Sequence, residues 1–157
     1  MKKSKAVFLL LLCLMIAFVF TGCKNKDTIS SDFFKSTLES KGYQISDITE
    51  EYDDYGIQTG VLMAVDSEEI NVEFQFHQMI GEEEAQTMFY DNKKIWDEKE
   101  GERSHCTELN VANYNKYSLQ IDGEYVVFSQ IADTLILVHT SSEYKDEVKE
   151  VLALLGY

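Results

Sequence analysis

The chain has 157 residues, of which 45% are hydrophobic and 27% are charged, and its formal net charge is −14. This length allows one domain of ordinary size, and the apolar fraction excludes a chain that is disordered throughout. The negative charge argues against a nucleic-acid partner, because phosphate binding requires a basic surface. Three cysteines are too few to build a disulfide scaffold.

The N-terminal segment carries the strongest motif of the sequence. Lysines within residues 2–5 precede an uninterrupted apolar run over residues 6–20, which is shorter than the roughly 20 residues that a membrane-spanning helix needs. A charged start followed by a short apolar stretch is typical of a secretory signal peptide. With Thr21, Gly22 and Cys23 after it, the segment resembles a bacterial lipoprotein signal, in which the cysteine is lipidated and becomes the new N-terminus.

This resemblance implies cleavage after Gly22, lipidation of Cys23 and attachment to the outer face of the cell membrane. On this interpretation residues 1–22 are the signal peptide, residues 23–31 are the lipidated cysteine and a short tether, and residues 32–157 are a single α+β domain. Cleavage removes three lysines and no acid, so the net charge changes from −14 to −17. The alternative is an uncleaved signal anchor in which Cys23 stays a free thiol.

The tether of residues 24–31 is short, so the domain is expected to stay near the membrane. Eight residues reach less than roughly 30 Å when fully extended. Lys24 and Lys26 are expected beside the lipid head groups, because anionic lipid attracts basic side chains near the surface. The rest of the acidic chain is repelled by such a surface.

The first half of the domain shows one helical pattern and two extended ones. A short amphipathic helix is predicted over residues 29–41, with polar residues at its start and Gly42 after its end. Strands are predicted over residues 57–65 and 70–77. Alternation in the second strand places its apolar residues on one face: Ile70, Val72, Phe74 and Phe76.

A second helix is predicted over residues 81–98, where the apolar period changes. Its buried stripe is expected to contain Ala85, Met88, Phe89, Ile95 and Trp96. Three glutamates occupy the first turn of this helix, which suits the positive end of the helix dipole. That role explains the acidic triplet without a metal, and no metal site is expected.

The second half of the domain is predicted to be strands followed by a helix. Asp122–Gly123 separates two alternating segments, which indicates a tight hairpin, and a second turn is expected at Ala132–Asp133. A C-terminal helix is predicted over residues 142–155. The order is helix, two or three strands, helix, about four strands and helix, so the fold class is α+β, with a mainly antiparallel sheet packed against about three helices. This order resembles the Mog1/PsbP-type α/β/α sandwiches.

The search for chemistry finds no catalytic constellation and no cofactor motif. Cys106 lies beside His105, and neighbouring residues of a strand point to opposite faces, so the two cannot form a nucleophile–base pair. Cys106 is expected to be a small buried residue. His77 and His139 end predicted strands without the spacing of zinc ligands and are expected at the surface or rim. We therefore expect no enzyme.

Four tyrosines are candidates for a recognition surface: Tyr52, Tyr55, Tyr114 and Tyr117. At the level of the whole chain, the lipoprotein signal, the helix that begins at Glu82, the segment Tyr125–Phe128 and the Leu-Gly-Tyr ending together resemble small uncharacterised lipoproteins of anaerobic Gram-positive bacteria. That resemblance implies no activity.

Two functions from different classes remain beside the disfavoured enzyme. The first is a non-catalytic module that binds another envelope protein or a polymer, and it predicts an exposed apolar or aromatic patch. The second is a small-ligand-binding lipoprotein, and it predicts a cavity of at least about 300 Å³ between sheet and helices.

Overall fold

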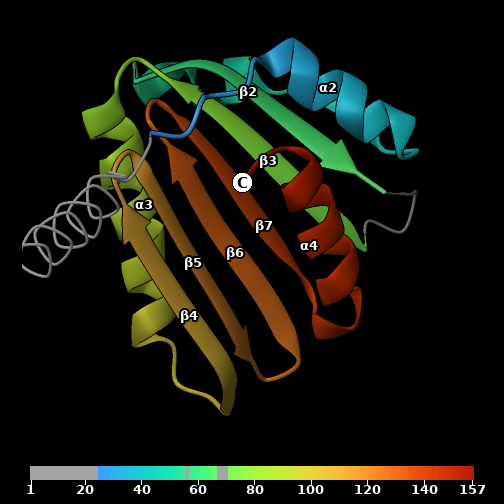
Figure 1. Cartoon of the computed structure of the whole chain (residues 1–157), viewed down its shortest axis with the longest axis vertical. Helices are drawn as coiled ribbons and strands as arrows, with labels where there is room; N and C mark the ends of the chain where they lie inside the picture. The colour runs from blue at the N-terminus through green and yellow to red at the C-terminus, as the bar shows by residue number, and fades with distance from the viewer. Residues whose placement is uncertain (1–24, 56, 67–70) are drawn as a thin grey trace, which may run out of the picture.

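The computed structural model describes residues 25–55, 57–66 and 71–157 (Figure 1). The elements in chain order are α2 (Ser31–Ser40), β1 (Gln44–Asp47), the 3-10 helix η1 (Thr49–Tyr55), β2 (Gln58–Val65), β3 (Val72–Met79), α3 (Glu82–Glu98), β4 (Arg103–Val111), β5 (Tyr114–Ile121), β6 (Glu124–Ile131), β7 (Thr134–Ser141), the 3-10 helix η2 (Ser142–Tyr144) and α4 (Lys145–Leu154).

A seven-stranded sheet in the order β1-β2-β3-β7-β6-β5-β4 organises the domain, and every neighbouring pair is antiparallel. Helices α2 and α4 cover one face of the sheet, and α3 covers the other (Figure 1). The α+β class with an antiparallel sheet and three helices is thereby confirmed. The Mog1/PsbP likeness stays a resemblance.

The turns follow the local signals of the sequence. The hairpin between β5 and β6 pairs Leu119 with Val126 and Tyr117 with Phe128, as predicted from its turn. Asp122 and Gly123 both have left-handed backbone conformations, with φ of 50° and 83°. Asp-Gly is a favoured pair for such a turn, because glycine adopts positive φ without strain. At the start of α2, the Ser30 hydroxyl accepts a hydrogen bond from the amide of Phe33, which caps the helix as expected.

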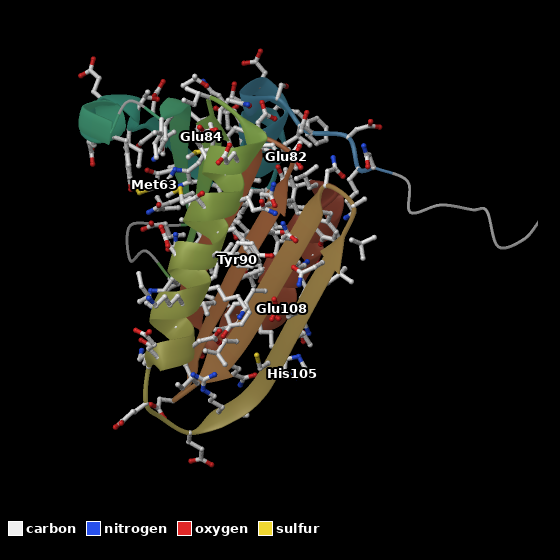
Figure 2. All side chains as sticks on the ribbon, turned by 90° about the vertical axis from the view of Figure 1, so that its left-hand side faces the viewer. Met63, Glu82, Glu84, Tyr90, His105 and Glu108 are labelled. Carbon is white, nitrogen blue, oxygen red and sulfur yellow. The ribbon has the colours of Figure 1, made fainter. Side chains whose placement is uncertain are left out.

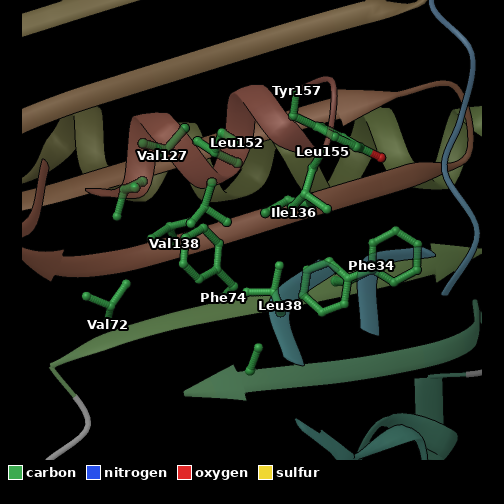
Figure 3. Close-up of a cluster of buried hydrophobic side chains, with 14 of the residues drawn as sticks. Phe34, Leu38, Val72, Phe74, Val127, Ile136, Val138, Leu152, Leu155 and Tyr157 are labelled. Atoms are coloured by element: carbon green, nitrogen blue, oxygen red, sulfur yellow. The ribbon is translucent and has the colours of Figure 1, made fainter. Parts of the chain in front are cut away.

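The larger core lies between the sheet and the pair α2 and α4 (Figure 3). Phe34 and Leu38 from α2 and Leu152 from α4 point toward Phe74 and Ile136 of the sheet. All five are at most 1% exposed. The alternation predicted for β3 is confirmed for Val72, Phe74 and Phe76, while Ile70 lies outside the described residues. Burial of these faces supplies most of the driving force for folding.

The smaller core lies under α3 on the opposite face. Ala85 and Phe89 are fully buried, and Met88 and Trp96 are partly buried against β5, β6 and β7. Ile95 was predicted on the same stripe, but its side chain is 66% exposed. Ile95 directly precedes Trp96, so one helical residue turns it by about 100° toward solvent. Within the described part of the chain, no helix is long and apolar enough to cross a membrane.

Candidate binding cleft

A cleft of about 470 Å³ lies between α3 and the start of β2. Its lining residues come from three elements and the loop before β2: Tyr52, Ile57, Gln58, Glu83, Glu84, Thr87, Met88 and Asp91. Residues 83, 84, 87, 88 and 91 follow helical spacing, so they share one side of α3. The volume is above the minimum of about 300 Å³ that a small-ligand site was expected to have.

The cleft combines apolar side chains with carboxylates. Ile57 and Met88 are partly buried and supply aliphatic and thioether surface. Glu83 and Asp91 are exposed, and Glu84 is partly buried. Among the residues that the structure describes, these three carboxylates form no salt bridge. Their charge is therefore free to interact with a ligand.

A buried histidine supports the inner wall of the cleft. His77 on β3 is 0% exposed, and its ring packs edge-on against Tyr52 with the ring centroids 5.5 Å apart. Its Nδ1 lies 2.9 Å from Oε1 of Gln58, and its Nε2 lies 3.3 Å from Oε1 of Gln75. These contacts connect the side chains of Tyr52 and Gln58 to strand β3. The expectation that His77 lies at the surface or rim was wrong, because Tyr52 of η1 packs over its ring.

Burial gives His77 a role in stability. Desolvation lowers the pKa of His77 to about 4, from 6.5 for the free side chain. Between these values the unfolded chain binds a proton and the folded chain does not, so stability falls as the pH falls from 6.5 to 4. We expect a loss of up to about 3 kcal/mol from this group. Urea unfolding at several pH values should show this decrease in the free energy of unfolding in the wild type. The same decrease should occur in His139→Gln, which replaces an exposed histidine. In His77→Gln the free energy of unfolding should depend less on pH. An unchanged pH dependence in this variant would contradict the role given to His77.

A smaller hollow of about 250 Å³ continues along the same helix. It lies between the second half of α3 and strands β3 and β7, and its lining includes Gln75, Asn92, Trp96 and His139. The Trp96 and His139 rings meet at 5.3 Å, and the ammonium of Lys99 lies 4.3 Å from the centre of the Trp96 ring. Trp96 is thus held by neighbours within the chain.

The four tyrosines do not form one recognition surface. Tyr114 and Tyr117 are 6% and 1% exposed and lie on opposite faces of β5, where Tyr117 stacks on Phe128 at 5.9 Å. Odd spacing within one strand separates them. Tyr52 lines the cleft, and the side chain of Tyr55 lies outside the described residues.

The thiol and the histidines are dispersed. Cys106 is exposed, which corrects the expectation of burial, because β4 is an edge strand that α3 does not cover. Cys106 pairs with Leu119 and His105 with Gln120, so their side chains point to opposite faces as predicted. His139 is three strand spacings from Cys106, roughly 14 Å. Within the described ranges no three His, Cys, Asp or Glu side chains are placed to hold a metal ion.

The sequence contained only part of this site. The acidic triplet at the start of α3 was visible, but its helix-dipole role concealed that Glu83 and Glu84 also border a cavity. Thr87 and Asp91 follow at helical spacing on the polar edge of the predicted stripe, and that spacing was the available signal. Ile57 and Gln58 were assigned only to a strand.

No protein-family model matches the chain, and no curated protein matches it. A solved structure that it is similar to is a GTP binding regulator from Thermotoga maritima, with 25% sequence identity and a TM-score of 0.48. The alignment covers 81% of this chain and 87% of that chain. Similarity at this level transfers no function.

Proposed function

We propose that the protein is a lipid-anchored, extracytoplasmic binding module that holds a basic, amphipathic segment of another envelope protein in the cleft beside α3. The observation that carries the proposal is a cavity of about 470 Å³ in which apolar side chains lie beside unpaired carboxylates. A lysine or arginine flanked by an apolar residue matches both features, with the charge near Glu83 and Asp91 and the apolar group near Met88.

The lipoprotein signal supports the anchored part of the proposal. Thr21, Gly22 and Cys23 follow a short apolar run, and a diacylglyceryl group on Cys23 would supply two chains, enough for lasting attachment. A module held at the membrane meets other envelope proteins at high local concentration, so a modest intrinsic affinity suffices.

A binding role without catalysis agrees with the placement of reactive groups. The exposed Cys106 has its neighbour His105 on the opposite face, and His77 is buried under Tyr52. Nucleophilic catalysis requires a base within hydrogen-bond reach of the nucleophile, and these residues do not provide one. The carboxylates of the cleft are therefore assigned to recognition.

A small cationic ligand is the alternative occupant, and the size of the cleft favours it. A volume of about 470 Å³ lies within the range of about 300–1,000 Å³ that is typical of small-molecule sites. A small organic cation would use the same carboxylates as a basic peptide, but it would bury less apolar surface.

A titration with defined probes tests the site. The chain from residue 23 onward, with Cys23→Ser, is titrated with a short peptide of alternating lysine and leucine, with its glutamate–leucine counterpart and with spermidine. We expect the basic peptide to bind, with an affinity that decreases as salt increases. Preferential binding of spermidine would favour the alternative, and equal binding of both peptides would contradict a charge-selective cleft.

Charge-neutralising variants assign the binding to the cleft. The double variant Glu83→Gln with Asp91→Asn should bind the basic peptide about tenfold or more weakly, because two carboxylate contacts are lost. Glu98→Gln with Glu100→Gln is the matched control, since it removes the same charge from exposed positions outside the cleft. Equal losses in the two double variants would show a general charge effect and would reject the cleft as the site.

A further inference from the structure

Among the described residues before α2, Ile29 packs against the larger core, and Lys26 is hydrogen-bonded to the domain. The backbone N–H of Lys26 donates to Oδ1 of Asn113 at 2.9 Å, and Nδ2 of Asn113 donates to the carbonyl of Lys26 at 2.9 Å. The ammonium of Lys26 donates to the carbonyl of Gly156 at 2.8 Å and lies 3.7 Å from the centre of the Tyr114 ring. We call this set of contacts the Lys26 clamp.

The Lys26 clamp shows which groups of the domain this lysine contacts. Its ammonium is directed at the end of α4 and at an aromatic ring, and its place beside the lipid head groups stays a prediction. Partial burial lowers the pKa of the Lys26 ammonium. A cation near the last carbonyls of a helix also suits the negative end of the helix dipole. The tether is therefore shorter than residues 24–31.

The clamp lies at one defined end of the sheet. Asn113 sits in the turn between β4 and β5, and its carbonyl accepts a hydrogen bond from Ala132 in the turn between β6 and β7. The carbonyl of Asp133 in turn accepts from Met79, at the end of β3. In Figure 1 the blue segment before α2 crosses this end of the sheet. The opposite end carries the turn at 122–123, about 26 Å away along the eight residues of β5.

From these contacts we propose that the Lys26 clamp sets the orientation of the domain on the membrane, with the turns that contain Asn113 and Ala132 facing the lipid surface. The inference rests on the proposed lipidation of Cys23. Lys26 follows Cys23 by three residue steps, which span at most about 11 Å. The clamped end is thus held within that distance of the lipidated residue, and the opposite end is held away.

This orientation places the binding cleft in the half of the domain nearest the membrane. Gln58 of the cleft pairs with Met79 at the clamped end of the sheet, and Glu83 lies in the first turn of α3. Figure 2 shows this end of α3, with Glu82 and Glu84, at the same level as the segment before α2. A basic, amphipathic partner that gathers on anionic lipid would reach the cleft along the membrane surface.

Fluorescence quenching on vesicles tests the orientation. Full-length lipidated protein carrying Cys106→Ser is labelled at Asn110→Cys or at Ser104→Cys, two exposed positions of β4 about 20 Å apart. The proteins are inserted into vesicles of phosphatidylglycerol and phosphatidylethanolamine that contain a head-group quencher. We expect severalfold stronger quenching of the probe at residue 110 than at residue 104. Equal quenching in protein that floats with the vesicles overturns the orientation, and failure to float overturns the anchor itself.

A clamp variant links the orientation to the observed contacts. Asn113→Ala removes both hydrogen bonds to the Lys26 backbone, and the difference between the two probes should disappear. Amide hydrogen exchange provides a measurement that needs no lipid: the N–H of Lys26 should exchange about tenfold faster in Asn113→Ala. Because Asn113→Ala could weaken its turn, Lys26→Leu, which removes only the ammonium contacts, should reduce the probe difference in the same direction. An unchanged probe difference in both variants would overturn the role of the clamp.

Discussion

Replacing Cys23 with serine is expected to move most of the protein from the membrane fraction into the medium or the soluble fraction. Serine has no thiol to receive a diacylglyceryl group, so the proposed lipid anchor is lost. The measurement is fractionation of producing cells, with a radiolabelled fatty acid added during growth. Wild type should carry the label in the membrane fraction.

A second cysteine, Cys106, is the matched control for this experiment. Cys106 is an exposed thiol on β4, so Cys106→Ser should stay in the membrane and keep the label. Intact mass separates the remaining possibilities. A wild-type protein that retains residues 1–22 and carries no lipid would be a signal anchor, and this outcome would contradict the lipoprotein assignment.

Replacing Phe89 with alanine is expected to destabilise the fold by about 3–5 kcal/mol, as is typical for truncation of a buried aromatic residue. Phe89 is fully buried and belongs to the apolar cluster that α3 forms with β5, β6 and β7. Its loss would also displace the α3 wall of the cleft, so binding of the basic peptide should fall together with stability.

Ile95→Ala tests the same helix at an exposed position. The sequence placed Ile95 and Phe89 on one stripe, whereas the structure leaves Ile95 66% exposed. We expect Ile95→Ala to change the free energy of unfolding by less than about 0.5 kcal/mol, since surface substitutions away from special features have small effects. Equal destabilisation by the two substitutions, measured by urea unfolding, would contradict the observed exposure of Ile95.

Local patterns predicted the sheet well because they act over short distances. The Asp122–Gly123 turn determined which residues of β5 and β6 face each other, and alternation assigned the buried face of β3. The buried stripe of α3 was predicted less accurately. Helical periodicity over several turns gives the direction of the stripe, but it does not decide whether a residue at its edge, such as Ile95, is buried or faces solvent. The strand β4 gave no clear pattern, because both of its faces are exposed along most of its length.

The cleft depends on contacts that no local pattern contains. Tyr52 and Gln58 reach the first half of α3 only because β2 and β3 pair and Tyr52 of η1 packs on His77. The Lys26 clamp likewise joins residues 87 positions apart in the sequence. Periodicity also could not distinguish tyrosines in the core from tyrosines at a surface, and Tyr114 and Tyr117 proved to be core residues.

Mapping the bound basic peptide onto the domain tests whether the cleft beside α3 is its binding site. Backbone amide shifts of the Cys23→Ser chain, recorded by NMR during a titration with the lysine–leucine peptide, locate the site without any assumption about charge. We predict that the largest changes occur at Tyr52, Ile57, Thr87, Met88 and Asp91, which line the cleft. Changes centred on β4 and β5, with those five amides unmoved, would contradict binding in the cleft.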